Sequence, residues 1–209
     1  MLRFYHAPWS RSSGVLWLLE ELGVGYELTH VDIRAESGVP EDYRAIQPNK
    51  KVPAVEHDGV VVTERAAISI HLADAFPQAG LAPAIGDPDR ARYLTMLVYV
   101  DSVLDPCVAA RAQDWTYEGN AFSFGAFDDM VAYVARVLTE RPFAAGDRFT
   151  AADTHLASAI RYTMGVLKAL PERPAFTSYL ERIGERPALL RAQAKDAELA
   201  ATVPAWRKR

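Results

Sequence analysis

Polar side chains that could bind or activate a small ligand lie at three junctions in the first third of the chain. Ser10 follows a strand pattern and precedes a helical one, and Glu64 lies where another strand ends and a helix begins. A carboxylate at such a point can accept from an ammonium group, while the backbone N–H groups that follow it attract a carboxylate. Lys51 precedes Val52 and Pro53, which lead into a further strand. The junctions therefore offer a hydroxyl group, an acceptor for a cation and a site for an anion.

The elements that position these residues begin with a strand over residues 2–6. From Val15, apolar residues recur at i, i+3, i+4 and i+7, as they do on one face of a helix, and Gly23 ends that helix. A second strand over residues 26–31 follows after a short link. Strand, helix and strand with short links form a βαβ unit, so we expect the two strands to be parallel.

A β-hairpin is predicted next, because Asp58-Gly59 separates two β-rich runs over residues 52–57 and 60–63. A helical pattern over residues 64–76 follows the hairpin. The first third of the chain is therefore predicted to have the order βαβ, then ββα.

The rest of the chain is predicted to be helical. Residues 78–88 are rich in proline and glycine, which predicts a linker between a first domain of residues 1–77 and an all-helical domain of residues 89–209. Within the helical half, Thr150 is followed three residues later by Asp153, a capping box that begins a helix. We interpret this box as structural, with no part in chemistry.

Charge and hydropathy argue against several kinds of partner. The formal net charge of −4 gives no basic field for nucleic acid or for an anionic membrane. No apolar run approaches the roughly 20 residues that span a bilayer, so no membrane is expected. The terminal Arg207-Lys208-Arg209 is interpreted as a solvated tail. The N-terminal sequence lacks a signal pattern, which predicts a cytoplasmic protein.

Cysteine and histidine usage restricts the chemistry further. Cys107 is the only cysteine, which excludes an internal disulfide, a Cys-x-x-Cys redox pair and a cysteine-rich zinc site. Cys107 is interpreted as a small core residue of an apolar helix. The five histidines lie on separate elements without metal-ligand spacing. We therefore expect no metal, and structural or surface roles for the histidines.

The order of the elements and three local motifs together resemble the soluble glutathione S-transferase family. The motifs are Lys51-Val52-Pro53-Ala54, the turn Val62-Thr63-Glu64 from strand to helix, and Thr150-x-x-Asp153 after Ala145-Gly146-Asp147. The resemblance covers nearly the whole chain and suggests a bacterial-like, serine-type member. It implies an α/β, thioredoxin-like glutathione-binding domain followed by an all-α domain.

The resemblance also implies contacts to glutathione. A cis bond before Pro53 would turn the backbone of Val52 outward, to pair with the cysteinyl segment as an added strand would. Glu64 would accept from the ammonium group, and Lys51 would reach the glycyl carboxylate or stay solvated. Arg65 stands where the family usually has serine, and it would hold a carboxylate, pair with Glu64 or point to solvent.

Glutathione must lose its thiol proton to become a nucleophile. In serine-type members the activating hydroxyl lies where Ser10 does, and in tyrosine-type members it lies where Tyr5 does. Ser12, Ser13 or a backbone N–H group are further alternatives, and either serine could instead be the N-cap of the helix.

The expected function is attack of the glutathione thiolate on a hydrophobic, electrophilic small molecule, with peroxide reduction or isomerisation as variants. The alternative is a non-catalytic glutathione-binding or regulatory protein on the same scaffold. A thiol oxidoreductase using Cys107 is less favoured, because that residue lies in the other domain. The resemblance further implies a detoxification role and a homodimer. Candidate contacts for the electrophile come from the first long helix after the linker and its end: Tyr99, Val103, Cys107, Trp115 and Tyr117.

Overall fold

The computed structural model describes residues 1–203, so the basic tail at residues 207–209 lies outside the described part. The chain divides into two compact units. The first contains Met1–Ala79 and the chain from Arg186 onward, and the second contains Gly80–Glu185. A small mixed sheet is the centre of the first unit, and the second unit is helical.

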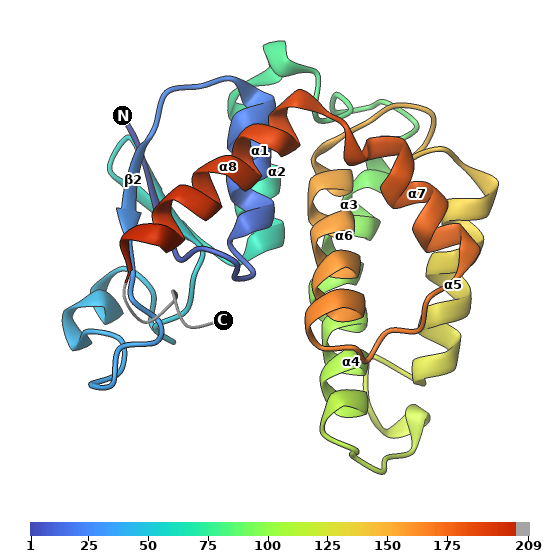
Figure 1. The fold of residues 1–209 in the computed structure, drawn as a ribbon. Helices are drawn as coiled ribbons and strands as arrows, with labels where there is room; N and C mark the ends of the chain where they lie inside the picture. Colours follow the sequence, from blue (N-terminus) through green and yellow to red (C-terminus); the bar gives the residue numbers. More distant parts are fainter. Residues whose placement is uncertain (204–209) are drawn as a thin grey trace. The chain divides into compact units, whose positions relative to one another are not determined.

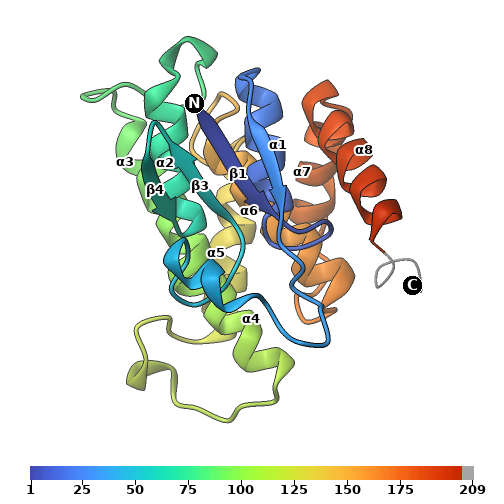
Figure 2. The same ribbon diagram turned by 90° about the vertical axis from the view of Figure 1, so that its left-hand side faces the viewer.

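The sheet of the first unit has four strands in the order β2-β1-β3-β4. Their bounds are β1 (Leu2–His6), β2 (Glu27–His30), β3 (Ala54–His57) and β4 (Val60–Thr63). Strand β1 is parallel to β2 and antiparallel to β3, and β4 is antiparallel to β3 (Figure 2). The βαβ-ββα order and the hairpin are therefore confirmed.

Helix α1 (Ser13–Leu22) is almost entirely buried, because it packs on other elements along its length. Its residues Leu16, Leu18 and Leu19 are fully buried, and each such side chain stabilises the fold by about 2 kcal/mol relative to an exposed one. Gly23 ends the helix with φ of 66°, a conformation that glycine adopts at little cost. Helix α2 (Arg65–Ala75) covers the sheet with Ile68 and Leu72.

The last helix, α8 (Pro187–Thr202), packs along α1 and belongs to the first unit (Figures 1 and 2). The sequence placed this helix in the helical domain of residues 89–209. The difference arises because α8 buries its apolar face against α1, and because Glu20 of α1 bonds to Arg191 (3.0 Å) and Lys195 (2.5 Å) of α8. Sequence periodicity shows that a helix has an apolar face but not which partner covers it.

The second unit begins with one long helix over residues 90–112. It consists of α3 (Arg90–Tyr99), a π-helical turn (Val100–Leu104) and α4 (Asp105–Ala112). By length and composition this helix could cross a membrane, contrary to the expectation from the sequence, although core helices of soluble domains meet the same test. Tyr93, Leu97 and Val100 are buried, and α3 packs on α6 within the unit.

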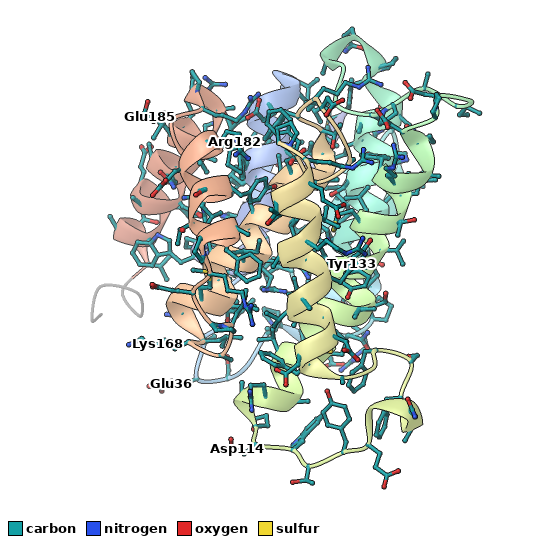
Figure 3. The ribbon with its side chains drawn as sticks, turned by 90° about the vertical axis from the view of Figure 1, so that its right-hand side faces the viewer. Glu36, Asp114, Tyr133, Lys168, Arg182 and Glu185 are labelled. Carbon is teal, nitrogen blue, oxygen red and sulfur yellow. The ribbon has the colours of Figure 1, made fainter. Side chains whose placement is uncertain are left out.

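Helices α5 (Phe127–Glu140), α6 (Ala151–Arg161) and α7 (Pro174–Gly184) complete the second unit. In Figure 3, Tyr133 marks α5 and Arg182 lies on α7, where it donates to the Pro142 carbonyl at 2.8 Å. The predicted capping box begins α6, with the Thr150 N–H donating to Asp153 Oδ2 at 2.8 Å. The same carboxylate accepts from the Ala144 N–H and the Tyr179 hydroxyl, so it joins α6 to the preceding loop and to α7.

Candidate functional site

The strand register brings the three polar junctions to one end of the sheet. Tyr5 at the end of β1 pairs with Ala54 at the start of β3, and Ala54 pairs with Thr63 at the end of β4. The loop with Ser10 follows β1, Val52 and Pro53 precede β3, and Glu64 follows β4. All three junctions therefore open at the same end of the first unit.

The loop before β3 presents a free stretch of backbone. The Val52–Pro53 bond is cis, as the family resemblance implied. The loop is fixed on its other side, where the Lys51 N–H donates to Gln47 at 2.9 Å and the Lys51 carbonyl accepts from Tyr43 at 3.0 Å. Within residues 1–203, the backbone N–H and C=O of Val52 form no hydrogen bond. Both groups can therefore pair with an extended peptide.

Glu64 occupies a strained backbone position at the start of α2. Its φ is 65° and its ψ is 128°, and non-glycine residues rarely adopt a positive φ. Such strain gathers at binding sites, where the surrounding structure holds it in place. The Glu64 carbonyl accepts the first α2 hydrogen bond, from Ile68 at 2.9 Å. Glu64 is thus the N-cap residue, directly before the N-terminal end of α2 that attracts anions.

Arg65 is buried, with 8% of its surface exposed. Of the three roles proposed for it from the sequence, a side chain directed into solvent does not agree with this burial. Lys51, by contrast, is exposed.

Ser10 is held in a dense hydrogen-bond arrangement between β1 and α1. Its hydroxyl lies 2.7 Å from the Ala7 carbonyl, to which it donates, and 2.8 Å from the Ser12 hydroxyl. The Ser12 N–H donates to the Ser10 oxygen at 3.1 Å. Ser12 stands at the N-cap position of α1, but its side chain makes no capping bond there. Instead, Ser12 supports Ser10.

Tyr5, the alternative thiol activator, has its hydroxyl directed at a carboxylate. The phenol lies 3.4 Å from Glu56 Oε2 and donates to it. The ring packs with Tyr43 at a centroid distance of 5.7 Å, in an apolar cluster that includes Val31 and Ala54. The Tyr5 and Ser10 hydroxyls therefore each have a protein acceptor, Glu56 Oε2 at 3.4 Å for Tyr5 and the Ala7 carbonyl at 2.7 Å for Ser10.

Two residues that the sequence analysis left without a site role extend the arrangement around Ser10. His6 Nδ1 lies 2.7 Å from the Ser12 hydroxyl, and His6 Nε2 lies 2.8 Å from Asp196 Oδ1. His6 was assigned only a structural or surface role, and Asp196 lies 190 residues away on α8. The position of His6, at the end of a strand and four residues before Ser10, was the one signal in the sequence.

Cys107 and its neighbours form a separate group in the second unit. The Cys107 thiol lies 3.4 Å from the Phe124 carbonyl, and burial raises the pKa of the thiol. Tyr117 contacts the rings of Phe122 and Phe124, whereas Trp115 is 65% exposed. All four residues follow Asp114 in the sequence, and Asp114 is labelled in Figure 3. Tyr99 packs instead against Tyr133 of α5, with centroids 4.6 Å apart.

Among residues 1–203, no group of three or more histidine, cysteine or carboxylate side chains is arranged to hold a metal ion. The polar groups at the end of the sheet are hydroxyl, carboxylate and backbone groups, which suit an organic zwitterion.

Comparison with known proteins shows the family of the chain. The family description "Glutathione S-transferase, N-terminal domain" matches residues 1–74, and "Glutathione S-transferase, C-terminal domain" matches residues 111–195. The chain belongs to the soluble glutathione S-transferase family. The first match contains every residue that the sequence analysis assigned to the glutathione site.

Individual members of the glutathione S-transferase family resemble the chain over most of its length. A glutathione S-transferase of Escherichia coli is 28% identical over 191 residues, which are 89% of this chain and 94% of that protein. A glutathione transferase structure from Methylococcus capsulatus has a TM-score of 0.78 at 28% identity and covers 94% of this chain and 99% of its own. A sphingomonad glutathione S-transferase, solved in complex with glutathione, has a TM-score of 0.74 at 28% identity, with coverage of 93% and 98%.

Proposed function

We propose that this protein is a glutathione transferase that joins the glutathione sulfur to electrophilic small molecules. The observation that carries the proposal is the convergence of Ser10, Val52 and Glu64 at one end of the sheet. The glutathione S-transferase relatives support the same function and do not favour the non-catalytic alternative.

Glutathione binding uses the three junctions together. The N–H and C=O of Val52 pair with the cysteinyl segment, as an added β-strand does. The Glu64 carboxylate accepts from the ligand's ammonium group, and the N-terminal end of α2 holds its α-carboxylate. Arg65, which is buried at the start of α2, adds positive charge to this end of the site. The exposed Lys51 lies next to Val52 in the loop before β3 and meets the glycyl carboxylate.

Thiol activation is assigned to Ser10. Lowering a thiol pKa by two units requires about 2.7 kcal/mol of preferential stabilisation of the anion. A hydroxyl hydrogen bond to a charged sulfur supplies roughly 1.5–3 kcal/mol, and the N-terminal end of α1 adds a further favourable field. Ser10 lies three residues before α1 begins at Ser13, so we assign the hydroxyl hydrogen bond to Ser10 and the field to the helix.

Conjugation then needs only proximity and an electrophile. The thiolate attacks the electrophilic carbon, a carbon–sulfur bond forms, and the leaving group or an adjacent π-bond takes the electron pair. We also propose a homodimer in the cytoplasm with a role in detoxification.

Calorimetric titration with glutathione tests binding. Wild type is expected to bind below millimolar concentration, and Glu64→Gln to bind at least about tenfold more weakly, because it loses a charge-assisted hydrogen bond. Glu118→Gln, at an exposed position in the second unit, is the matched control and should bind as wild type does. Absence of binding by wild type at millimolar glutathione would contradict the proposal. Thiol-transfer activity that disappears in Cys107→Ser would instead support the thiol oxidoreductase.

A further inference from the structure

A continuous chain of hydrogen bonds connects the Ser10 hydroxyl to a buried carboxylate on α8. It runs from Ser10 to Ser12 (2.8 Å), from Ser12 to His6 Nδ1 (2.7 Å), and from His6 Nε2 to Asp196 (2.8 Å). All three distances are those of well-formed hydrogen bonds between polar side chains. We call these four residues (Ser10, Ser12, His6 and Asp196) the relay.

The relay is closed to water beyond Ser10. His6 and Ser12 are fully buried, and Asp196 is 5% exposed. The His6 ring stacks on Phe4 with a centroid distance of 5.0 Å. Among the described residues, His30 also faces His6, as its partner across the parallel strand pair, and burial lowers the pKa of His30. A proton that moves along the relay therefore passes between side chains and not through solvent.

Asp196, at the far end of the relay, sets which nitrogen of His6 donates and which one accepts. An ionised Asp196 only accepts, so His6 carries its proton on Nε2 and Nδ1 is an acceptor. Ser12 then donates to Nδ1. The Ser12 oxygen accepts from Ser10 when the Ser10 proton turns away from the Ala7 carbonyl, to which it donates in the structure. The Ala7 carbonyl competes for both hydroxyl protons, at 2.7 Å from Ser10 and 3.1 Å from Ser12, and the Ala7 N–H donates to Ser12 at 3.3 Å. For Ser12, His6 is the nearer acceptor of the two.

We propose that the relay receives the proton of the glutathione thiol and stores it on His6, an inference that rests on Ser10 being the residue that meets the sulfur. The S–H bond breaks as its proton passes to the Ser10 oxygen. The Ser10 proton passes to Ser12, and the Ser12 proton passes to His6 Nδ1. One proton has then left sulfur and one has reached nitrogen, leaving a thiolate and an imidazolium ion paired with Asp196.

The transfer reverses the bonds between the sulfur and His6, whereas His6 Nε2 still donates to Asp196. It leaves Ser10 in the role assigned to it above. His6 Nδ1 now donates to Ser12, Ser12 donates to Ser10, and Ser10 donates to the thiolate. Asp196 compensates the charge on His6, which would otherwise be costly in a buried position. The same four groups thus remove the proton and then stabilise the anion, with Ser12, His6 and Asp196 acting as positioning residues behind Ser10.

Counting the protons released on binding tests the relay. Calorimetry at pH 7 in buffers of different ionisation enthalpy gives the number of protons lost to solvent. S-methylglutathione, which lacks the thiol proton, serves as the reference ligand.

For wild type we expect the thiolate absorbance to appear with almost no proton released relative to the reference. His6→Gln and Asp196→Asn should bind glutathione with at least about a tenfold lower ratio of thiolate to thiol at this pH, a shift of about one pKa unit. Any thiolate that they still form should release its proton to the buffer. His30→Gln, on the neighbouring strand, is the matched control and should behave as wild type does.

Release of about one proton for each thiolate formed by wild type would overturn the relay, even if both variants failed to fold. It would also be overturned if folded His6→Gln kept the wild-type thiol pKa and proton count. Failure of the proposed function looks different, because wild type would then bind no glutathione or show no thiolate at all.

Discussion

His6 at the end of β1 and Asp196 on α8 are joined by a buried hydrogen bond of 2.8 Å between Nε2 and Oδ1. This bond ties the last helix of the chain to the strand that leads into the Ser10 loop. Ala200 and Val203, at the end of the same helix, pack with Ala7 in that loop and with Val52 before β3. Helix α8 therefore supports the candidate site as well as the core of the first unit.

The packing of α8 on α1 is expected to weaken in acid through Glu20. Burial alone would raise the pKa of Glu20, but the hydrogen bonds from Lys195, Tyr26 and Arg191 together lower it below its ordinary value. A lowered folded-state pKa stabilises the fold above the unfolded-state value, and this stabilisation is lost as the pH falls through the folded-state value. Glu20→Gln should lower the free energy of unfolding by about 1–2 kcal/mol at pH 7.

Urea unfolding of wild type and Glu20→Gln between pH 7 and pH 3 measures this effect. The difference between the two proteins should shrink as Glu20 becomes protonated in wild type. A constant difference across that range would show that Glu20 acts through its packing and not through its charge.

Asp153 is expected to be the polar side chain on which the second unit depends most. Its two oxygens accept from the Ala144 and Thr150 N–H groups and from the Tyr179 hydroxyl. An asparagine would turn an N–H₂ group toward one set of these donors, so Asp153→Asn should destabilise the protein by about 3 kcal/mol. Asp147→Asn, in the exposed loop before it, should change stability by less than about 0.5 kcal/mol.

The effect of Asp153 should also depend on pH. Burial raises the pKa of Asp153 to about 6, against the opposing hydrogen bonds from Ala144, Thr150 and Tyr179. The stabilisation linked to a raised pKa is complete below the unfolded-state value and is lost as the pH rises through about 6. Thermal unfolding should therefore show a smaller difference between wild type and Asp153→Asn at pH 7.5 than at pH 5. A difference that grows with pH would contradict this assignment.

Glu64 should show opposite effects on binding and on stability. Its φ of 65° is one that glycine adopts freely, so Glu64→Gly should keep or raise the free energy of unfolding, by up to about 1 kcal/mol, while glutathione affinity falls. Glu64→Gln keeps the backbone strain and should lose affinity without gaining stability. Unfolding and binding measured on both variants test this. Wild-type affinity in Glu64→Gly would remove Glu64 from the site.

The residues near turns and helix ends predicted the local elements of both units well. Gly23, Asp58-Gly59 and the Thr150–Asp153 box each act locally, and the elements that they delimit are present in the structure. The partners of α8 could not be predicted in this way, because Glu20 and Arg191 meet only after the whole chain has folded. For the same reason Asp196 was missed, although Ser10, Val52 and Glu64 could be selected from their positions between strands and helices. The cis bond at Pro53 was expected only from the family resemblance.

The pKa of the glutathione thiol in the complex shows whether Ser10 activates the sulfur. Thiolate absorbance is followed against pH for wild type, Ser10→Ala and Tyr5→Phe, each saturated with glutathione. We expect a wild-type thiol pKa about two units below that of free glutathione, a value raised by at least about one unit in Ser10→Ala, and no change in Tyr5→Phe. A wild-type pKa equal to that of free glutathione, or one that moves in Tyr5→Phe and not in Ser10→Ala, would contradict it.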